Sequence, residues 1–116
     1  MIVRSIIFYS SPFTKTIAIN IAKGLKGYVD VENYSYPNKH IDMDPFHNVI
    51  YVVEKNNEDL IKNIKKYAIY YEFKQKYICL LSSKPFTIKE EKFNFICFEE
   101  PKQLVVESIE KINNGD

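Results

Sequence analysis

The sequence predicts an α/β protein with three layers, built on a five-stranded and mainly parallel sheet. Short apolar runs alternate along the chain with segments whose apolar residues recur at helical spacing. The first and third apolar runs are nearly continuous, as expected of strands covered on both faces. The 116 residues suit a single domain spanning 1–116, and 46% hydrophobic residues are enough to build its core.

The first half of the chain predicts two strands with a helix between them. Residues 2–9 form the first apolar run, which ends at Ser10-Ser11-Pro12. Residues 13–26 have helical spacing, and Gly24 and Gly27 weaken and then end that helix. Residues 28–31 are predicted as a short strand, and the polar residues 33–47 as a long loop.

The second half predicts three more strands and two helices. Residues 49–53 form the clearest buried strand, and residues 56–59 supply a cap and early carboxylates for a helix with apolar positions from Leu60 to Tyr71. Residues 77–81 and 93–98 are the fourth and fifth strands, and Pro101 opens the last helix. The connector at 83–92 is barely long enough for a parallel crossover, so the fifth strand could pair with its neighbour in either the parallel or the antiparallel direction.

Charge and hydropathy exclude several classes of protein. A net charge of +1 does not indicate nucleic-acid binding, and no apolar run approaches the length of a membrane span, so we expect a cytoplasmic protein without a membrane partner. Cys79 and Cys97 lie within apolar strands and are expected to be buried and reduced. Residues 40–47 hold two His and two Asp without the spacing of a known metal motif, so a solvated loop is the preferred interpretation.

Residues 6–18, Ile6-Ile7-Phe8-Tyr9-Ser10-Ser11-Pro12-Phe13-Thr14-Lys15-Thr16-Ile17-Ala18, resemble the first strand, loop and helix of flavodoxins. That family has a loop of the form [ST]-x-[ST]-G-x-T around the phosphate of flavin mononucleotide (FMN). Ser11 matches its first position and Thr16 its last, whereas Phe13 replaces a hydroxyl residue and Thr14 replaces the glycine. The resemblance implies strand order 2-1-3-4-5, bound FMN and electron transfer.

The same resemblance extends loosely to the third and fourth strands. Flavodoxins cover the flavin ring with aromatic residues from the loops that follow those strands. Here the third strand is followed by Glu54-Lys55-Asn56-Asn57 without an aromatic residue, and only Phe86 is available after the fourth. A receiver domain of a response regulator has the same strand order, but it needs an acidic pair after the first strand and an Asp at the end of the third. This chain has Ser10-Ser11 and Val53-Glu54 at those places.

A parallel sheet of this order binds ligands beyond the carboxyl ends of its strands, where the strand order reverses. The sequence predicts that one wall of this crevice is formed by Ser10, Ser11, Thr14, Lys15 and Thr16, and the other by Glu54 and Lys55. Ser82, Ser83 and Lys84 come from the next strand, and the flavodoxin resemblance adds Phe86 as the residue that would stack on a flavin ring. Hydroxyl groups beside a helix N-terminus suit a phosphate-bearing ligand, although Ser and Thr are also ordinary helix caps.

Two functions therefore remain open at this level. The first is a small flavodoxin-like protein that binds FMN and transfers electrons. The second is a degenerate flavodoxin-like or receiver-like domain without a cofactor, which acts on a protein partner as an interaction or regulatory module. The missing glycine and aromatic residues favour the second, and the recognisable first loop favours the first.

Overall fold

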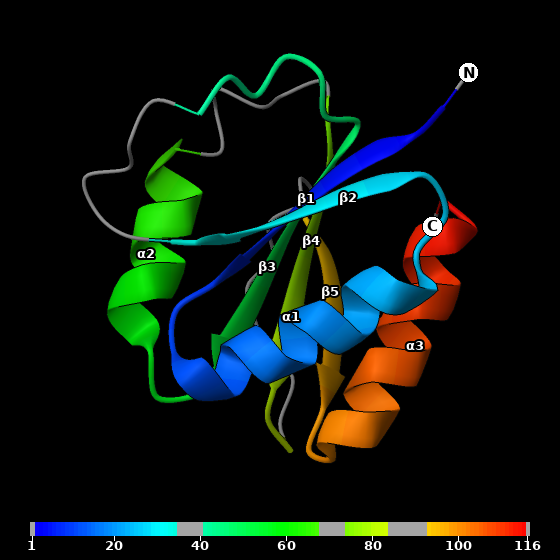
Figure 1. Cartoon of the computed structure of the whole chain (residues 1–116). Coiled ribbons are helices and arrows are strands. Elements are labelled where there is room, and N and C mark those ends of the chain that lie inside the picture. Colours follow the sequence, from blue (N-terminus) through cyan, green and yellow to red (C-terminus); the bar gives the residue numbers. More distant parts are fainter. Residues whose placement is uncertain (1, 35–40, 68–73, 84–92, 116) are drawn as a thin grey trace.

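Five strands form one all-parallel sheet in the order β2-β1-β3-β4-β5 (Figure 1). The structure is a computed structural model that describes residues 2–34, 41–67, 74–83 and 93–115. The strands are β1 (Arg4–Tyr9), β2 (Tyr28–Asn33), β3 (Asn48–Glu54), β4 (Gln75–Leu81) and β5 (Asn94–Phe98). The predicted fold class and strand order are confirmed, and the open question of the fifth strand is settled because β5 pairs parallel with β4.

Three helices cover the two faces of the sheet. Helices α1 (Pro12–Gly24) and α3 (Pro101–Asn113) lie together on one face, and α2 (Glu58–Tyr67) covers the other (Figure 1). This arrangement has the three layers that the sequence predicts. No helix in the described part of the chain is long and apolar enough to cross a membrane.

Each face of the sheet carries its own hydrophobic cluster, because side chains alternate along a strand. On the α1/α3 face, Ile7, Ile50 and Tyr77 lie in one register row across three strands. On the α2 face the neighbouring positions, such as Ile6 and Val49, pack with Ile61 and other residues of α2. Strand β3 is buried along both faces, which explains its continuous apolar run.

Several element ends differ from the prediction by one or two residues. Strand β1 begins at Arg4 rather than at residue 2, because β2 begins opposite it at Tyr28 and leaves Ile2 60% exposed. Helix α1 begins at Pro12 and ends at Gly24, three residues before Gly27 turns the chain with a φ of +84°. The expected continuation of the second helix to Tyr71 falls outside the described residues, which end there at Tyr67.

The two cysteines lie on adjacent strands but on opposite faces of the sheet. Cys79 is opposite Ile96 and Cys97 is opposite Leu80, so their side chains point in opposite directions and form no disulfide with each other. Cys79 is fully buried, as predicted. The expectation that Cys97 is buried as well is wrong: it is half-buried, because β5 is an edge strand.

Candidate functional site

The carboxyl ends of β1 and β3 mark the point where the strand order reverses. Strand β1 ends at Tyr9 and helix α1 begins at Pro12, so only Ser10 and Ser11 connect them. The predicted site residues Thr14, Lys15 and Thr16 therefore belong to the first turns of α1 rather than to a loop. A two-residue connection leaves little irregular backbone to wrap around a ligand.

The Thr14 side chain forms hydrogen bonds with both residues of this connection. It is completely buried, and its Oγ1 accepts hydrogen bonds from the backbone N–H groups of Ser10 at 3.0 Å and Ser11 at 2.9 Å. The Ser11 Oγ in turn accepts a hydrogen bond from the Thr14 N–H at 3.1 Å. Together these contacts form a reciprocal capping box, which satisfies the N–H groups of Ser10, Ser11 and Thr14.

The other predicted residues of this segment point outward. Thr16 is exposed, and its hydroxyl donates a hydrogen bond back to the Pro12 carbonyl oxygen at 3.3 Å. The Lys15 ammonium lies 5.6 Å from the centre of the Tyr9 ring, within the range of a cation–π contact. Phe13 is 47% exposed beside them, so the start of α1 presents an aromatic ring and a cation to solvent.

The remaining predicted site residues follow β4. Ser83 is exposed two residues after β4 ends, at the same edge of the sheet as Ser10 and Ser11 but with β3 between the two segments. Lys84 and Phe86 lie outside the described residues. The structure thus brings the two serine segments to one edge of the sheet, and it does not bring them into direct contact.

The phosphate of FMN fits this segment poorly. A phosphate held at such a turn needs backbone N–H groups that point toward it. Pro12 has no N–H, and the N–H groups of Ser10, Ser11 and Thr14 already bond to side-chain oxygens within the turn. The Ser10 Oγ has no partner among the described residues, but it is buried, so a ligand would reach it only after the turn opened.

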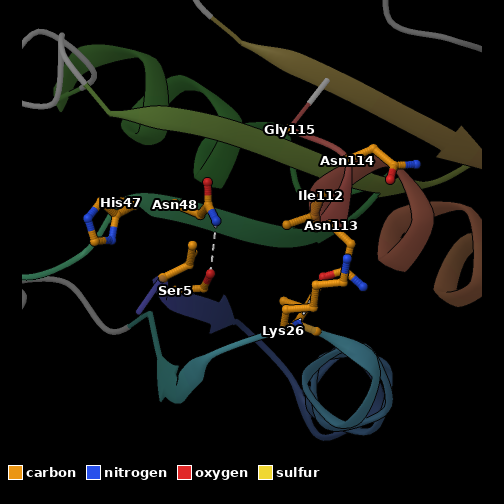
Figure 2. A pocket seen from close by; sticks show the side chains of 10 residues that line it. Ser5, Lys26, His47, Asn48, Ile112, Asn113, Asn114 and Gly115 are labelled. Carbon is orange, nitrogen blue, oxygen red and sulfur yellow. Dashed lines mark hydrogen bonds between the residues drawn. The ribbon is translucent and has the colours of Figure 1, made fainter. Parts of the chain in front are cut away.

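A pocket of about 280 Å³ lies at the opposite, amino-terminal edge of the sheet (Figure 2). Its floor is formed by Ser5 and Asn48, which are paired in register on β1 and β3. Both are buried, and the Asn48 Nδ2 donates a hydrogen bond to the Ser5 Oγ at 3.0 Å. The facing wall comes from the ends of α1 and α3, with Leu25 and Ile112 as its apolar members.

The wall of this pocket is fixed by hydrogen bonds between the ends of the two helices. The Asn113 carboxamide accepts a hydrogen bond from the Lys26 N–H at 2.9 Å and donates one to the Gly24 carbonyl oxygen at 3.0 Å. Gly27 is required next to it, because its φ is +84° and a Cβ there would lie 2.0 Å from the Val3 carbonyl oxygen. The turn after α1 is therefore held against both α3 and β1.

His47 lies at the rim of the same pocket (Figure 2). Its Nδ1 accepts a hydrogen bond from the Arg4 N–H at 3.2 Å, which places the proton of the neutral ring on Nε2. Within the ranges that the structure describes, no three His, Cys, Asp or Glu side chains gather closely enough to hold a metal ion. His40 lies outside those ranges.

The sequence did not predict this pocket, because a parallel sheet of this order is expected to bind ligands beyond the carboxyl ends of its strands. One signal was present in the sequence. Asn48 directly precedes the clearest buried strand, and an amide buried at the start of an apolar run needs a polar partner. That partner, Ser5, lies 43 residues away in the chain, so only the register of β1 against β3 reveals the pair.

The chain matches no protein-family model, and comparison with curated proteins finds no similar sequence. The sheet order and the helix arrangement are consistent with a flavodoxin-like fold. The functional argument therefore depends on the geometry of the chain itself.

Proposed function

We propose that this protein is a flavodoxin-like domain that works without FMN, as a protein-interaction or regulatory module. The single observation that carries the proposal is the buried Thr14 hydroxyl, which occupies the hydrogen-bonding position that a phosphate would need. To bind a phosphate there, the chain would have to break the capping box. Each buried polar group that this change leaves without a hydrogen bond costs about 1–3 kcal/mol of stability.

The surface beside the closed turn supports a role in binding a protein. Phe13 is 47% exposed in the first turn of α1, and the exposed Lys15, two residues further along, contacts the half-buried Tyr9 ring through its ammonium group. Full burial of a phenylalanine side chain is worth about 1.5–3 kcal/mol, so a partner that covers the exposed half of Phe13 gains on the order of 1 kcal/mol from it. Aromatic residues are enriched at such contact surfaces.

Binding of FMN with electron transfer is the alternative, and the Ser10 hydroxyl is the observation that favours it. The Ser10 Oγ is buried at the end of β1 without a partner among the described residues, and a phosphate oxygen would satisfy it. Binding of inorganic phosphate or another small anion at residues 10–16 depends on the same rearrangement. Both alternatives require the Thr14 side chain to leave the turn.

A titration with FMN separates the two functions. We expect the purified protein to be colourless and to leave the fluorescence of FMN unchanged at micromolar protein concentrations. The Thr14→Gly variant restores the family's glycine and removes the side chain that fills the turn, so it is expected to bind FMN more tightly than the natural protein. Thr14→Ser keeps the hydroxyl and is the matched control, for which no gain is expected.

Folding of these variants must be checked first, because Thr14→Gly removes a cap inside a helix. Its unfolding free energy, measured with urea, is expected to fall by about 2 kcal/mol, whereas Thr14→Ser should lose less. Quenching of FMN fluorescence by the natural protein at micromolar concentration would contradict the proposal and establish the flavin alternative.

A photo-crosslinking residue at position 13 tests the interaction surface directly. In an extract of the natural host, we expect a protein adduct from position 13 and none from the exposed position Asn20 on the same helix. The Phe13→Asp change should abolish binding of the captured partner to the purified domain. If both positions give the same adducts, Phe13 does not mark the contact surface.

A further inference from the structure

We propose that the pocket between Ser5, Asn48 and the ends of α1 and α3 binds an uncharged small molecule with an apolar body and an amide or hydroxyl head. The inference does not depend on the proposed function, because this pocket lies at the amino ends of β1 and β3, whereas the Thr14 turn follows the carboxyl end of β1. Either one can fail while the other holds.

The polar floor of the pocket has bonding capacity that the protein does not use. A carboxamide offers two donor hydrogens and an acceptor oxygen, and a serine hydroxyl offers one donor. Asn48 and Ser5 use one bond between them, from Nδ2 to Oγ, and make no other side-chain hydrogen bond within the described chain. Figure 2 shows the Asn48 nitrogen directed at Ser5 and its oxygen directed the other way.

This pair is unusual for its position in the sheet. The next residues along the same face are Ile7 and Ile50, which are fully buried in the cluster under α1 and α3. Burying an amide and a hydroxyl there is unfavourable unless their hydrogen bonds are satisfied. A ligand that both donates and accepts hydrogen bonds would satisfy the Asn48 oxygen and the remaining donors together.

The facing wall selects an apolar body of limited size. Leu25 is 9% and Ile112 is 5% exposed, so each presents only a small apolar surface to a ligand at this wall. A cavity of roughly 150 Å³ lined by aliphatic residues accommodates benzene, so about 280 Å³ has room for one ring and a polar head. The wall is preformed, because Asn113 connects it to the turn after α1, and binding need not order it.

The charges around the pocket favour an uncharged ligand. The ends of α1 and α3 that form the wall are helix C-termini, whose partial negative charge disfavours an anion. The Lys26 side chain at the rim is exposed and disfavours a cation. No carboxylate side chain is among the described residues that line the pocket.

A nuclear magnetic resonance titration with three matched probes tests the proposal. Benzamide has the ring and the amide, toluene has a similar size without the amide, and benzoate carries a charge. We expect benzamide to shift the amide signals of residues 3–5, 25–26, 47–48 and 112–115, with a millimolar dissociation constant. Toluene should bind at the same place about 2- to 10-fold more weakly, the range that one net hydrogen bond provides.

Variants connect this preference to the polar floor. In Asn48→Leu the preference for benzamide over toluene is expected to disappear, and in Ser5→Ala it should fall. Asn20→Ala, which changes an exposed amide on the outside of α1, should keep the ratio of the natural protein. If Asn48→Leu does not fold, the proposal is still tested by Ser5→Ala and by the ratio of benzamide to toluene affinity in the natural protein.

Three outcomes overturn the proposal. The first is the absence of shifts at these residues with 20 mM benzamide. The second is equal binding of benzamide and toluene by the natural protein. The third is tighter binding of benzoate, which would make the pocket an anion site controlled by Lys26.

Discussion

The Thr14 side chain determines whether the hydroxyl-rich segment between β1 and α1 is available to a ligand. The sequence 6–18 has the hydroxyl groups of a phosphate-binding loop, and in the structure three of them, from Ser11, Thr14 and Thr16, form hydrogen bonds within the chain itself. A glycine at position 14 would leave the N–H groups of Ser10 and Ser11 without this acceptor. The same pattern of residues therefore describes a ligand site in one backbone and a helix cap in another.

Cys79 allows a prediction about pH at the same scale. Burial raises the pKa of its thiol to about 12, partly offset by the hydrogen bond that the Ser108 hydroxyl donates to Sγ at 3.3 Å. Because the folded pKa lies above the unfolded value of about 9, the thiol contributes its full stability below pH 9. That contribution is lost as the pH rises from 9 toward 12.

We therefore expect the unfolding free energy of the natural protein to fall more steeply between pH 9 and 10.5 than that of Cys79→Ala. The limiting difference in slope is about 1.4 kcal/mol per pH unit. Urea unfolding of both proteins at several pH values gives the difference and cancels the titration of Lys and Tyr. Parallel slopes would show that Cys79 does not control this range.

Cys97 is half-buried with a less shielded thiol, so a thiol reagent should label it before Cys79.

At the scale of elements, the contact between α1 and α3 depends on the last residue of α1. A Cβ on Gly24 would lie 2.4 Å from the Ile109 Cδ1, 2.9 Å from Cγ1 and 3.0 Å from Cγ2. Because three atoms of one side chain lie so close, no single rotation of Ile109 removes the overlap. The absence of a side chain at Gly24 is what lets the two helices approach at this end.

Gly24→Ala is accordingly expected to destabilise the protein by about 1–2 kcal/mol, even though alanine is the better helix former. In an Ile109→Ala background the same change should cost little or become favourable, because the overlapping atoms are gone. A double-mutant cycle from urea unfolding measures this coupling. Additive effects of the two changes would mean that the helices adjust freely around the new methyl group.

At the scale of the whole molecule, burial decreases from the centre of the sheet to its edges. Six of the seven residues of β3 are buried, whereas β2 alternates between exposed and half-buried residues and pairs on one side only. Local opening of β2 therefore exposes little apolar surface, and opening of β3 requires nearly complete unfolding.

Hydrogen exchange should reproduce this gradient. We expect the amide hydrogens of β3 to exchange at least about tenfold more slowly than those of β2, a factor that corresponds to about 1.4 kcal/mol of opening free energy. The comparison is made residue by residue in native buffer, with intrinsic exchange rates divided out. Equal protection of the two strands would mean that the edge of β2 is covered in solution, for example by another molecule.

The sequence by itself determined the elements and their order. Continuous apolar runs predicted strands buried on both faces, and helical spacing predicted the covering helices, because both patterns follow from the local geometry of the backbone. The alternation of strands and helices also placed Ser10, Ser11 and Ser83 at one edge of the sheet, because the carboxyl ends of parallel strands meet there.

The tertiary structure alone decided the direction of β5 and the chemistry of both candidate sites. The connector at 83–92 permits either direction, and pairing with β4 is a contact between strands that no local pattern encodes. Thr14 became a cap rather than part of a loop because α1 begins at Pro12, directly after a two-residue turn. Ser5 and Asn48 became a polar floor because the register of β1 against β3 brings residues 43 positions apart into one hydrogen bond. Such pairings depend on register and packing across the sheet, and a single sequence specifies them only through the complete fold.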